Sequence, residues 1–586
     1  MCGLSGIFSN GLEKDAAIRV NESIDSLVHR GPDAVGYFSN ENVKLGHCRL
    51  AFKGQNPNNP VSDSGKRYYL GLNGEIYNYR DLAKEYGISK LIVDSAGDAG
   101  VVVELYKLLG EKSIGLLDGH FAFYIFDSLR NEIHLYRDRF GSKPLYYMRL
   151  GHEFIFCSEI KSLPLPRNYT PALNIDALSL YFKTQNFYGS ETIFQSIFLV
   201  EPGQHVALSQ HGVQTEFFYL QTSSRDEETT TESVLHEFER FFLDSVESQW
   251  EEGIRVSGYL SGGVDSSLIA ICANKLGFSY DTYTTKFAST SRDESMTAKN
   301  TASRLDFENF SVELDESLFW NKVSGISRVV EEPRFGQCIN NLMSMESISG
   351  RSKIVMSGIG ADELFGGYPW RYSFVDQQIL TIPVLKNALI SKQCRLSPIS
   401  EDLVSNVDRT YAEVKLNLIV DEVLANHSDH NFEKRGLYAA MSLDLKYWLP
   451  SLLVVEDKLS MSLGIETRMP FLNNNLWKLG NTVSAKTIFR DFKGTVEGKV
   501  PLRLLLTKWG FDELSTRPKQ GFSAPDNLWF SKSKHVERIF KKSNPLWDIL
   551  IRENFQRIYS EHNSGVLNHR GLLWSLIYMD DFITHW

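Results

Sequence analysis

The strongest constraint on the fold is a change of sequence pattern near residue 220. Before that point the chain reads as short strands separated by polar turns, for example at 67–78 (RYYLGLNGEIYN). Beyond it, strands alternate with helices. The intervening segment 223–233 (SSRDEETTTES) is polar and has the composition of a linker. Because 586 residues are too many for one ordinary core, we predict domains at residues 2–222 and 234–586.

The two halves predict different architectures. The first is mostly antiparallel β structure, with helices expected near 15–28 and 99–109. Strands separated by helices in the second half predict a parallel sheet, with nucleotide-binding crevices at the strand ends. The expected elements are strands near 254–260, 281–287 and 353–357 and helices at 266–275 and 295–305. From about residue 370 onward the chain reads as mainly helical.

Composition narrows the classes of function. A formal charge of −10, without a concentrated run of Lys and Arg, disfavours nucleic-acid binding. No run reaches the roughly 18 apolar residues that a membrane span requires. The six cysteines form no CxxC pair, which predicts neither a cysteine zinc site nor a disulfide framework and fits a reducing compartment. We therefore expect a cytoplasmic protein that acts on small molecules and binds neither nucleic acid nor a membrane.

The amino terminus offers a nucleophile beside its own base. Cys2 directly follows the initiator Met, and a side chain of that size normally allows Met1 to be trimmed. Residue 2 would then carry both a thiol and a free α-amine. The reference pKa of an α-amine, about 7.7–8.0, lets it act as general base for its own side chain. Taken alone, a cysteine at this position is more often there by chance.

Three further segments supply groups that suit an α-amino acid with an acyl side chain. Arg49 offers a fork for a carboxylate, Asp98 a charge for an ammonium group, and 73–75 (NGE) amide donors for an oxyanion. Each also has an ordinary structural explanation. Arg49 could form a surface salt bridge, Asp98 could cap a helix, and Asn73-Gly74 could be a hairpin turn.

A glycine-rich loop marks the second half. The segment 261–267 (SGGVDSS) lies between an apolar strand and a helix, where glycines and exposed N–H groups favour a phosphate. It is no Walker A loop, and the nearest candidate, 494–500, has one residue too few. A second loop at 357–368 could bring Asp362 towards Asp265, and two carboxylates on a triphosphate are a natural cradle for Mg²⁺. A helix cap is the alternative for Asp362.

With these residues in view, the first half resembles the class II glutamine amidotransferase domain, an N-terminal-nucleophile hydrolase with an αββα sandwich. The segments that carry the resemblance are MCGLSGIF, HRGPD (29–33), HCRL (47–50), NGEIYN (73–78), LDGHFAFYIFD (117–127), RDRFGSKPLYY (137–147) and SEIKSL (158–163). The resemblance implies that Cys2 is the nucleophile and that Asn73 and Gly74 form the oxyanion hole. The residues implied to hold glutamine are Arg49, Leu50, Asn73, Gly74, Glu75 and Asp98.

The second half is similar to the asparagine synthetase family, a parallel-sheet α/β ATP pyrophosphatase with added helices. SGGVDSS looks like its pyrophosphate loop, and DKLSM (457–461), ETRMPFL (466–472) and RPKQGFS (517–523) resemble its later motifs. The residues implied to bind ATP are Leu260, Ser261, Gly262, Gly263, Asp265, Ser266, Thr285, Ser357 and Gly358. The resemblance also implies Mg²⁺ on Asp265 and Asp362, and Lys519 as the group that stabilises phosphate charge during adenylation.

Together the two resemblances imply two half-reactions. Cys2 releases ammonia from glutamine, and the second domain uses ATP to adenylate a carboxylate, which ammonia converts to an amide. An internal tunnel for ammonia is implied as well, because free ammonia would be protonated and diluted in bulk water. The resemblance is compatible with a homodimer. A scaffold protein with inactive copies of both domains is disfavoured, since Cys2 and Asp265 are both present.

One departure bears on the acceptor. Where asparagine synthetases usually have an acidic residue in the loop Ser-Gly-Glu/Asp-Gly, this chain has Ile359. Isoleucine can neither meet an ammonium group nor accept a proton, although Glu363 or Glu332 could reach the same space. Aspartate is the first expectation for the acceptor. Another carboxylate, such as a sugar uronate or a biosynthetic acid, is the alternative, and a ring-closing reaction is disfavoured because it needs no ammonia.

Overall fold

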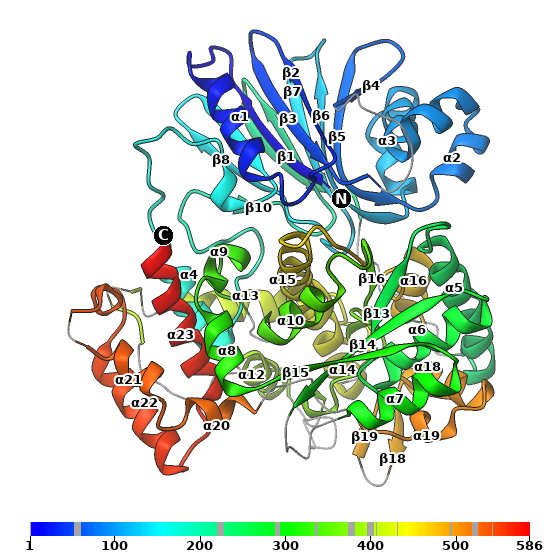
Figure 1. Cartoon of the computed structure of the whole chain (residues 1–586), viewed down its shortest axis with the longest axis vertical. Coiled ribbons are helices and arrows are strands. Elements are labelled where there is room, and N and C mark those ends of the chain that lie inside the picture. Colours follow the sequence, from blue (N-terminus) through cyan, green and yellow to red (C-terminus); the bar gives the residue numbers. More distant parts are fainter. Residues whose placement is uncertain are drawn as a thin grey trace. The chain divides into compact units, whose positions relative to one another are not determined.

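The computed structural model shows two compact units (Figure 1). The N-terminal unit comprises Met1–Leu173, Gly189–Gln221 and Glu456–Arg468, and the C-terminal unit comprises Asn174–Tyr188, Thr222–Val455 and Met469–Trp586. The residues that the structure describes are 2–51, 60–219, 225, 228–287, 294–334, 338–372, 381–394, 403–405, 407–408, 410–430, 432–492, 495–518, 525–541 and 543–586.

The N-terminal unit is built on two antiparallel sheets. In its described residues one sheet has the strand order β10-β8-β9-β1-β3-β2 and the other has the order β12-β11-β7-β6-β5-β4. The strands are β1 (Cys2–Phe8), β2 (Ala34–Ser39), β3 (Val43–Arg49), β4 (Val61–Ser62), β5 (Tyr68–Ile76), β6 (Gly119–Asp127), β7 (Glu132–Arg137), β8 (Tyr146–Leu150), β9 (Glu153–Cys157), β10 (Phe198–Leu199), β11 (Gln204–Ser209) and β12 (Gly212–Phe217). The helices are α1 (Ala16–Ser26), α2 (Tyr79–Glu85), α3 (Lys90–Leu109), η1 (Gly110–Leu116) and η2 (Ile160–Ser162).

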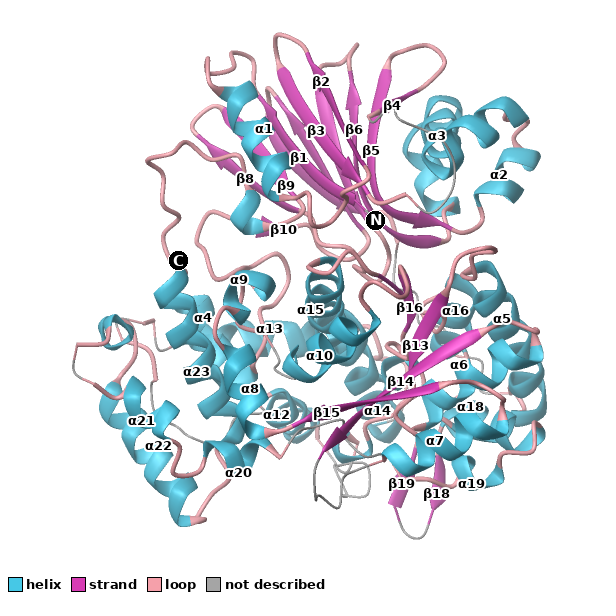
Figure 2. Cartoon of the chain, in the orientation of Figure 1, coloured by secondary structure: helices cyan, strands magenta, loops and turns pink. Residues whose placement is uncertain are grey.

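The two sheets pack face to face. Side chains from strands of both sheets form the core that the sheets share, including Leu4 from β1 and Tyr124 from β6. The opposite face of the second sheet packs against α2 and α3, as Figure 2 shows. On the outer face of the first sheet, Ile24 of α1 lies over Gly46 of β3. Helix, sheet, sheet and helix follow in that order, which confirms the αββα sandwich.

The C-terminal unit contains the predicted parallel sheet. The strands β13 (Val256–Tyr259), β14 (Tyr280–Phe287), β15 (Asn309–Leu314) and β16 (Ile354–Met356) run parallel in the order β15-β14-β13-β16. The first connection places α6 (Val264–Lys275) between β13 and β14, and the second places α7 (Ser295–Arg304) between β14 and β15. The strand order reverses between β13 and β16. In open parallel sheets the ligand crevice lies beside such a reversal, at the carboxyl ends of the strands.

The rest of the C-terminal unit is mostly helical, as its sequence predicts. Its further helices are α4 (Ile175–Thr184), α5 (Thr231–Ser248), α8 (Glu316–Val323), α9 (Ile326–Val330), α10 (Cys338–Ile348), α11 (Ala361–Leu364), η3 (Pro369–Arg371), α12 (Ile382–Gln393), α13 (Tyr411–Ala425), α14 (Phe432–Leu443), η4 (Asp444–Trp448), α16 (Asn474–Thr482), α17 (Ala485–Ile488), α18 (Val500–Lys508), α19 (Asp512–Ser515), α20 (Asp526–Phe530), α21 (Lys534–Ile539), η5 (Pro545–Asp548), α22 (Arg552–Ser564) and α23 (Arg570–His585). A small hairpin joins β18 (Arg490–Phe492) to β19 (Thr495–Glu497). Helix α15 (Leu449–Met461) begins in this unit and ends in the N-terminal one, to which β17 (Glu466–Arg468) also belongs.

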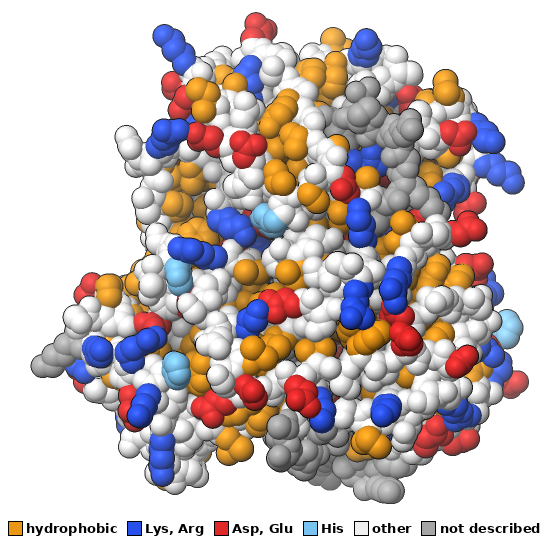
Figure 3. Space-filling view, in the orientation of Figure 1, with side chains coloured by type: hydrophobic (Ala, Val, Ile, Leu, Met, Phe, Trp, Pro, Cys, Tyr) orange, Lys and Arg blue, Asp and Glu red, His pale blue; other side chains and the backbone are white. Residues whose placement is uncertain are grey.

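The described surface carries both signs of charge. Acidic and basic side chains are interspersed over the visible face of each unit (Figure 3). Among the described helices, none combines the length and the apolar character needed to cross a membrane. Of the predicted linker 223–233, residues 223, 224, 226 and 227 lie outside the described residues, and residues 231–233 already belong to α5.

Candidate active sites

Cys2 is the first residue of β1, an interior strand of the first sheet. It pairs with Arg49 of β3, and its side chain is almost fully buried. The backbone nitrogen of Cys2 donates a hydrogen bond to Oδ1 of Asn73 at 3.1 Å. The strand pairing and this bond bring Cys2, Arg49 and Asn73 together within the N-terminal unit.

The environment of Cys2 favours a neutral thiol. Burial raises the pKa of the thiol, while the positive charges of the amino terminus and Arg49 act in the opposite direction. A thiol of this kind needs a neighbouring base to become a nucleophile. The α-amine of a trimmed Cys2 would be that base, since it lies on the same residue.

Asn73 and Gly74, the residues predicted to form the oxyanion hole, are neighbours on β5. Asn73 of β5 is fully buried, and its Nδ2 has no hydrogen-bond partner among the described residues. A buried donor without a partner costs about 1–3 kcal/mol, so its retention fits a donor that is kept for a ligand. Gly74 has a φ of +134°, and a Cβ there would lie 1.9 Å from the carbonyl oxygen of His120. Only glycine fits this backbone position.

Asp98 and Glu75, which are predicted to hold the ammonium group of glutamine, are two carboxylates whose negative charges repel each other. Asp98 follows a kink in α3 at Gly97 and accepts hydrogen bonds from the backbone nitrogens of Ile76, at 3.1 Å, and Ala99, at 2.8 Å. Burial raises the pKa of Asp98, against the effect of these two bonds. Burial also raises the pKa of Glu75, and the nearby charge of Asp98 raises it further. A bound ammonium group would favour the charged form of both carboxylates.

Arg30 is a site residue to which the sequence assigned no role. It lies in the segment HRGPD and is fully buried. Its guanidinium donates to the carbonyl oxygen of Cys2 at 3.1 Å, to Glu159 at 2.8 Å and to Asp457 at 2.7 Å. Burial opposes the charge of Arg30, but Asp457 and Glu159 outweigh this effect and raise its pKa. Asp457 is 427 residues away in sequence, so no local pattern could have disclosed the pair.

We expect Arg30→Met to destabilise the N-terminal unit by about 3 kcal/mol, because removing one partner leaves buried carboxylates uncompensated. The low end of the usual range applies because Lys143 lies 3.4 Å from Asp457 and Lys161 lies 2.9 Å from Glu159. Urea unfolding followed through glutamine hydrolysis measures the loss. The matched control is Arg167→Met, whose ion pair with Glu22 is exposed and should leave the midpoint unchanged. Equal midpoints for both variants would contradict the role of Arg30.

In the C-terminal unit, the loop after β13 is held in a compact turn. The side chains of Ser261 and Ser266 lie 3.2 Å apart, and the backbone nitrogen of Ser261 donates to Oγ of Ser266 at 3.2 Å. Leu260 is buried and is tied to β14 through the carbonyl oxygen of Tyr283 and the hydroxyl of Thr284. Helix α6 begins just after Gly263, so its first N–H groups lie beside the loop, where phosphate is favoured.

The loop after β16 lies against this turn. A Cβ at Gly358 would come within 2.9 Å of the Cβ of Asp265, so the two predicted ATP loops are adjacent. Ser357, which precedes Gly358, is buried. Thr285 lies on β14 with its hydroxyl 2.7 Å from that of Ser344. The sheet therefore brings together the predicted ATP residues of three parallel strands at their carboxyl ends.

A buried lysine joins the two predicted metal ligands. The Nζ atom of Lys499 lies 2.8 and 2.6 Å from the oxygens of Asp265 and 2.7 Å from Oδ1 of Asp362. Lys499 is only 3% exposed. The two carboxylates thus converge on one positive charge. Asp362 lies inside α11, whose N-cap is Gly360, so the alternative of a helix cap does not hold. Sequence reasoning considered Lys499 only within a failed Walker A match, since its contacts are far away in the chain.

Lys519 and the residues around Ile359 remain from the sequence predictions for the C-terminal unit. Lys519 lies outside the described residues. Ile359 is half-buried, and its backbone nitrogen donates to Oγ of Ser357 at 3.4 Å. Of the two acids that could replace a carboxylate at Ile359, Glu332 pairs with Arg334 at 3.1 Å. The other, Glu363, accepts a hydrogen bond from the hydroxyl of Tyr368 at 2.6 Å.

The fold and these two sites define a class of enzyme, an amidotransferase with a thiol site in one unit and a nucleotide-binding sheet in the other. Comparison with known proteins agrees. Residues 1–219 match the glutamine amidotransferase domain family, and residues 237–584 match the asparagine synthase family. The chain belongs to the asparagine synthase family and carries an N-terminal glutamine amidotransferase domain. It is accordingly an ATP-dependent, amide-forming enzyme of the glutamine-hydrolysing type.

Its relatives differ in name. The chain is 25% identical to the asparagine synthetase [glutamine-hydrolyzing] 1 of Bacillus subtilis (strain 168), with 98% of this chain and 95% of that protein covered. It is 27% identical to the amidase chry2 of Gibberella zeae, with 93% and 92% covered. It is 24% identical to the amidase chyE of Penicillium rubens, also with 93% and 92% covered.

Proposed function

We propose that this enzyme releases ammonia from glutamine at Cys2 and uses it to amidate a carboxylate that the C-terminal unit activates with ATP. The observation that carries the proposal is the pairing of two complete sets of groups in one chain. In one set Asn73 accepts a hydrogen bond from the backbone nitrogen of Cys2, and its Nδ2 is a donor without a partner among the described residues. The other places Asp265, Asp362 and Lys499 beside a phosphate-type loop.

In the first half-reaction the Cys2 sulfur attacks the side-chain amide carbon of glutamine. The α-amine of residue 2 takes the thiol proton and passes it to the leaving nitrogen, so ammonia departs and a thioester remains. The developing oxyanion accepts hydrogen bonds from Asn73 Nδ2 and the backbone at Gly74. Arg49 pairs with the carboxylate of glutamine, and Asp98 and Glu75 pair with its ammonium group. Water then hydrolyses the thioester to glutamate.

In the second half-reaction the carboxylate of the acceptor attacks the α-phosphorus of ATP, and pyrophosphate leaves. The loop 261–266 and the start of α6 hold the phosphates, and Lys499 places a positive charge beside them. Lys519 is proposed to stabilise the same phosphate charge. Ammonia then attacks the acyl adenylate, AMP departs and an amide forms.

Asp265 and Asp362 fit a magnesium ion. Their carboxylates already converge on the cationic Nζ of Lys499, and oxygen ligands beside phosphates are what Mg²⁺ prefers. When bound, the ion would neutralise charge on the departing pyrophosphate. The two aspartates would bind the ion through their oxygens, and Lys499 would remain beside the same two carboxylates.

Aspartate is the first proposal for the acceptor, since the family is that of asparagine synthase and relatives of nearly equal length carry the name asparagine synthetase. A second acceptor class is favoured by a specific residue. Ile359 removes the acid that usually lies in this loop, and two relatives that match 93% of the chain are named amidases. A less polar acceptor pocket would then take a carboxylate other than aspartate, such as a uronate or a biosynthetic acid.

The deciding experiment is an acceptor screen with ammonium salts as nitrogen source. Wild-type enzyme is given ATP, Mg²⁺ and either aspartate or one of a panel of carboxylates including uronates, and AMP and pyrophosphate are measured. Losing an acid–base participant typically costs 10²–10⁴-fold in rate. If Ile359 excludes aspartate, we expect Ile359→Glu to raise turnover of aspartate at least 10-fold and to lower turnover of the preferred acceptor.

Efficient turnover of aspartate by the wild type would remove the second acceptor class and leave asparagine synthesis. Ile359→Val is the matched control, because it keeps the position apolar and should leave the acceptor order unchanged. If the enzyme still hydrolyses glutamine but none of the carboxylates in the panel leads to release of AMP, the proposed ligase chemistry is wrong.

A cytoplasmic location and a homodimer stay predictions. A reducing compartment would suit the described cysteines, which are all free thiols.

A further inference from the structure

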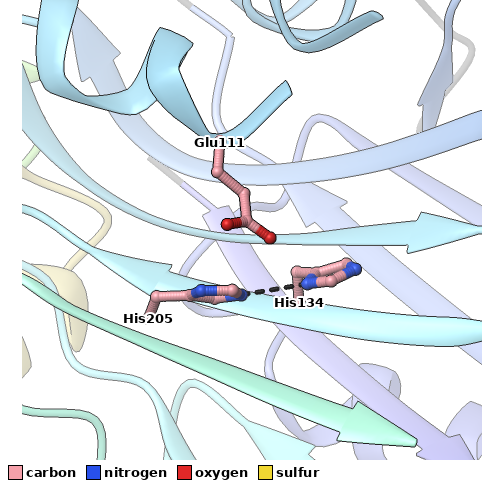
Figure 4. Close-up of side chains that lie close together, drawn as sticks. All are labelled: Glu111, His134 and His205. Carbon is pink, nitrogen blue, oxygen red and sulfur yellow. Dashed lines mark hydrogen bonds between the residues drawn. The ribbon is translucent and has the colours of Figure 1, made fainter. Parts of the chain in front are cut away.

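One cluster of side chains in the N-terminal unit has no part in the proposed chemistry. Glu111, His134 and His205 each offer one ligand atom, and these atoms lie within 4.8 Å of one another. Figure 4 shows the carboxylate of Glu111 pointing towards the two imidazole rings. Among the described residues, this is the group of His, Cys, Asp and Glu side chains that has the spacing of a three-ligand metal site.

The two histidines are set on neighbouring strands of the second sheet. His134 lies on β7 and His205 on β11, and the register places His134 opposite Ala207 and His205 opposite Tyr136. Both histidines are buried. The ring of His205 stacks on Tyr136 with centroids 4.3 Å apart and an angle of 8°. The rings are therefore held in place before any ligand arrives, which lowers the cost of binding an ion.

A hydrogen bond orients His205 towards the cluster. Its Nδ1 lies 2.9 Å from the carboxylate of Glu216, and its Nε2 lies 2.9 Å from Nδ1 of His134. A carboxylate can only accept, so the proton of His205 sits on Nδ1, and Nε2 presents its lone pair to the cluster. Without an ion, Nδ1 of His134 donates its proton to this lone pair, and binding of an ion moves the proton to Nε2 of His134. In metal sites the histidine ligand usually donates its other ring N–H to a carboxylate. This bond fixes the tautomer and makes the ring a better ligand.

We propose that Glu111, His134 and His205 bind a divalent transition-metal ion of the zinc class, through Nδ1 of His134, Nε2 of His205 and a carboxylate oxygen of Glu111. Two imidazoles and a carboxylate are a known ligand set for Zn²⁺, with water in the fourth position. Ligand atoms around a tetrahedral zinc ion lie about 3.3 Å apart, given bond lengths of about 2.0–2.1 Å. The two ring nitrogens are near this spacing, and Glu111 is exposed and able to move inward.

The ion would tie η1 to the sheet. Glu111 lies at the start of η1, which directly follows α3, the helix that carries Asp98. A bond from Glu111 through the metal to β7 and β11 would fix the end of α3 against the strands. The expected role is thus structural, and the site stands independently of the proposed amide chemistry. An ordinary His–His hydrogen bond is the alternative, and it predicts no affinity for metal.

The test uses the full chain after treatment with a chelator. Zn²⁺ is titrated by competition with a chromophoric chelator, Co²⁺ is followed by its visible absorption, and the unfolding temperature is measured with and without Zn²⁺. We expect one ion per chain and a rise in unfolding temperature on binding. Glu111→Gln should weaken binding at least 10-fold and His205→Gln at least 100-fold, and Glu216→Gln should weaken it about 10–100-fold.

Two controls separate this cluster from other ligands. His211→Gln removes an exposed histidine from the same hairpin and should bind Zn²⁺ like the wild type. Cys2→Ala should bind it equally, because that thiol lies outside the cluster. Glu111 and Glu216 lie at the surface, so their variants should fold even if His205→Gln does not. Failure of the wild type to take up Zn²⁺ at micromolar concentrations, or affinity unchanged in both Glu111→Gln and Glu216→Gln, would overturn the proposal.

Discussion

Cys2→Ala is expected to reduce glutamine hydrolysis by at least about 10⁴-fold, because it removes the nucleophile and leaves only the binding groups and oxyanion donors. Amide formation from added ammonium salts should continue near the wild-type rate. The thiol serves only the first half-reaction, while Asp265, Asp362 and Lys499 lie in the C-terminal unit. Glutamate, AMP and pyrophosphate are each measured with glutamine and then with ammonium chloride as nitrogen source.

The control for Cys2→Ala is Cys48→Ala. Cys48 is buried on β3, and burial raises the pKa of its thiol to about 12, so it is no nucleophile at neutral pH. Cys48→Ala should keep glutamine hydrolysis, apart from any loss of stability. A folded Cys2→Ala protein that also fails with ammonium salts would show that the division of labour between the units is wrong.

Asp265→Asn is expected to lower pyrophosphate release about 10³-fold or more with every acceptor, whether glutamine or ammonia is the nitrogen source. The neutral amide can neither hold Mg²⁺ in the same way nor pair with Lys499, and several kcal/mol of phosphate stabilisation correspond to about that factor in rate. Glutamine hydrolysis should persist, since its groups lie in the other unit. Exchange between labelled pyrophosphate and ATP, with acceptor present, measures the adenylation step directly.

Asp281→Asn is the matched control for Asp265→Asn. Asp281 lies on the neighbouring strand β14, in the same sheet, and its ion pair is with Arg255, which is largely exposed. We expect its pyrophosphate release to equal that of the wild type. Adenylation at the wild-type rate in Asp265→Asn would show that Asp265 is not a ligand of the metal or of the phosphates.

The features that could be read from the sequence are local ones. The segment 67–78 is rich in Tyr and Leu and predicts the strand β5 from its own residues. The prediction of a free α-amine on Cys2 rests on its place directly after Met1. The string SGGVDSS marks a turn between strand and helix without any knowledge of its neighbours, since glycines and N–H groups at a helix start suffice.

Only the tertiary structure decided which segments far apart in the chain are in contact. Lys499 meets Asp265 across 234 residues, and Arg30 meets Asp457 across 427. Propensity and periodicity describe a chain over one or two turns and carry no information about which distant charges will share a buried place. The sequence by itself thus determined the two architectures and predicted the nucleophile and the phosphate loop. Folding decided which charges compensate one another, because burial makes an unpaired charge too costly to keep.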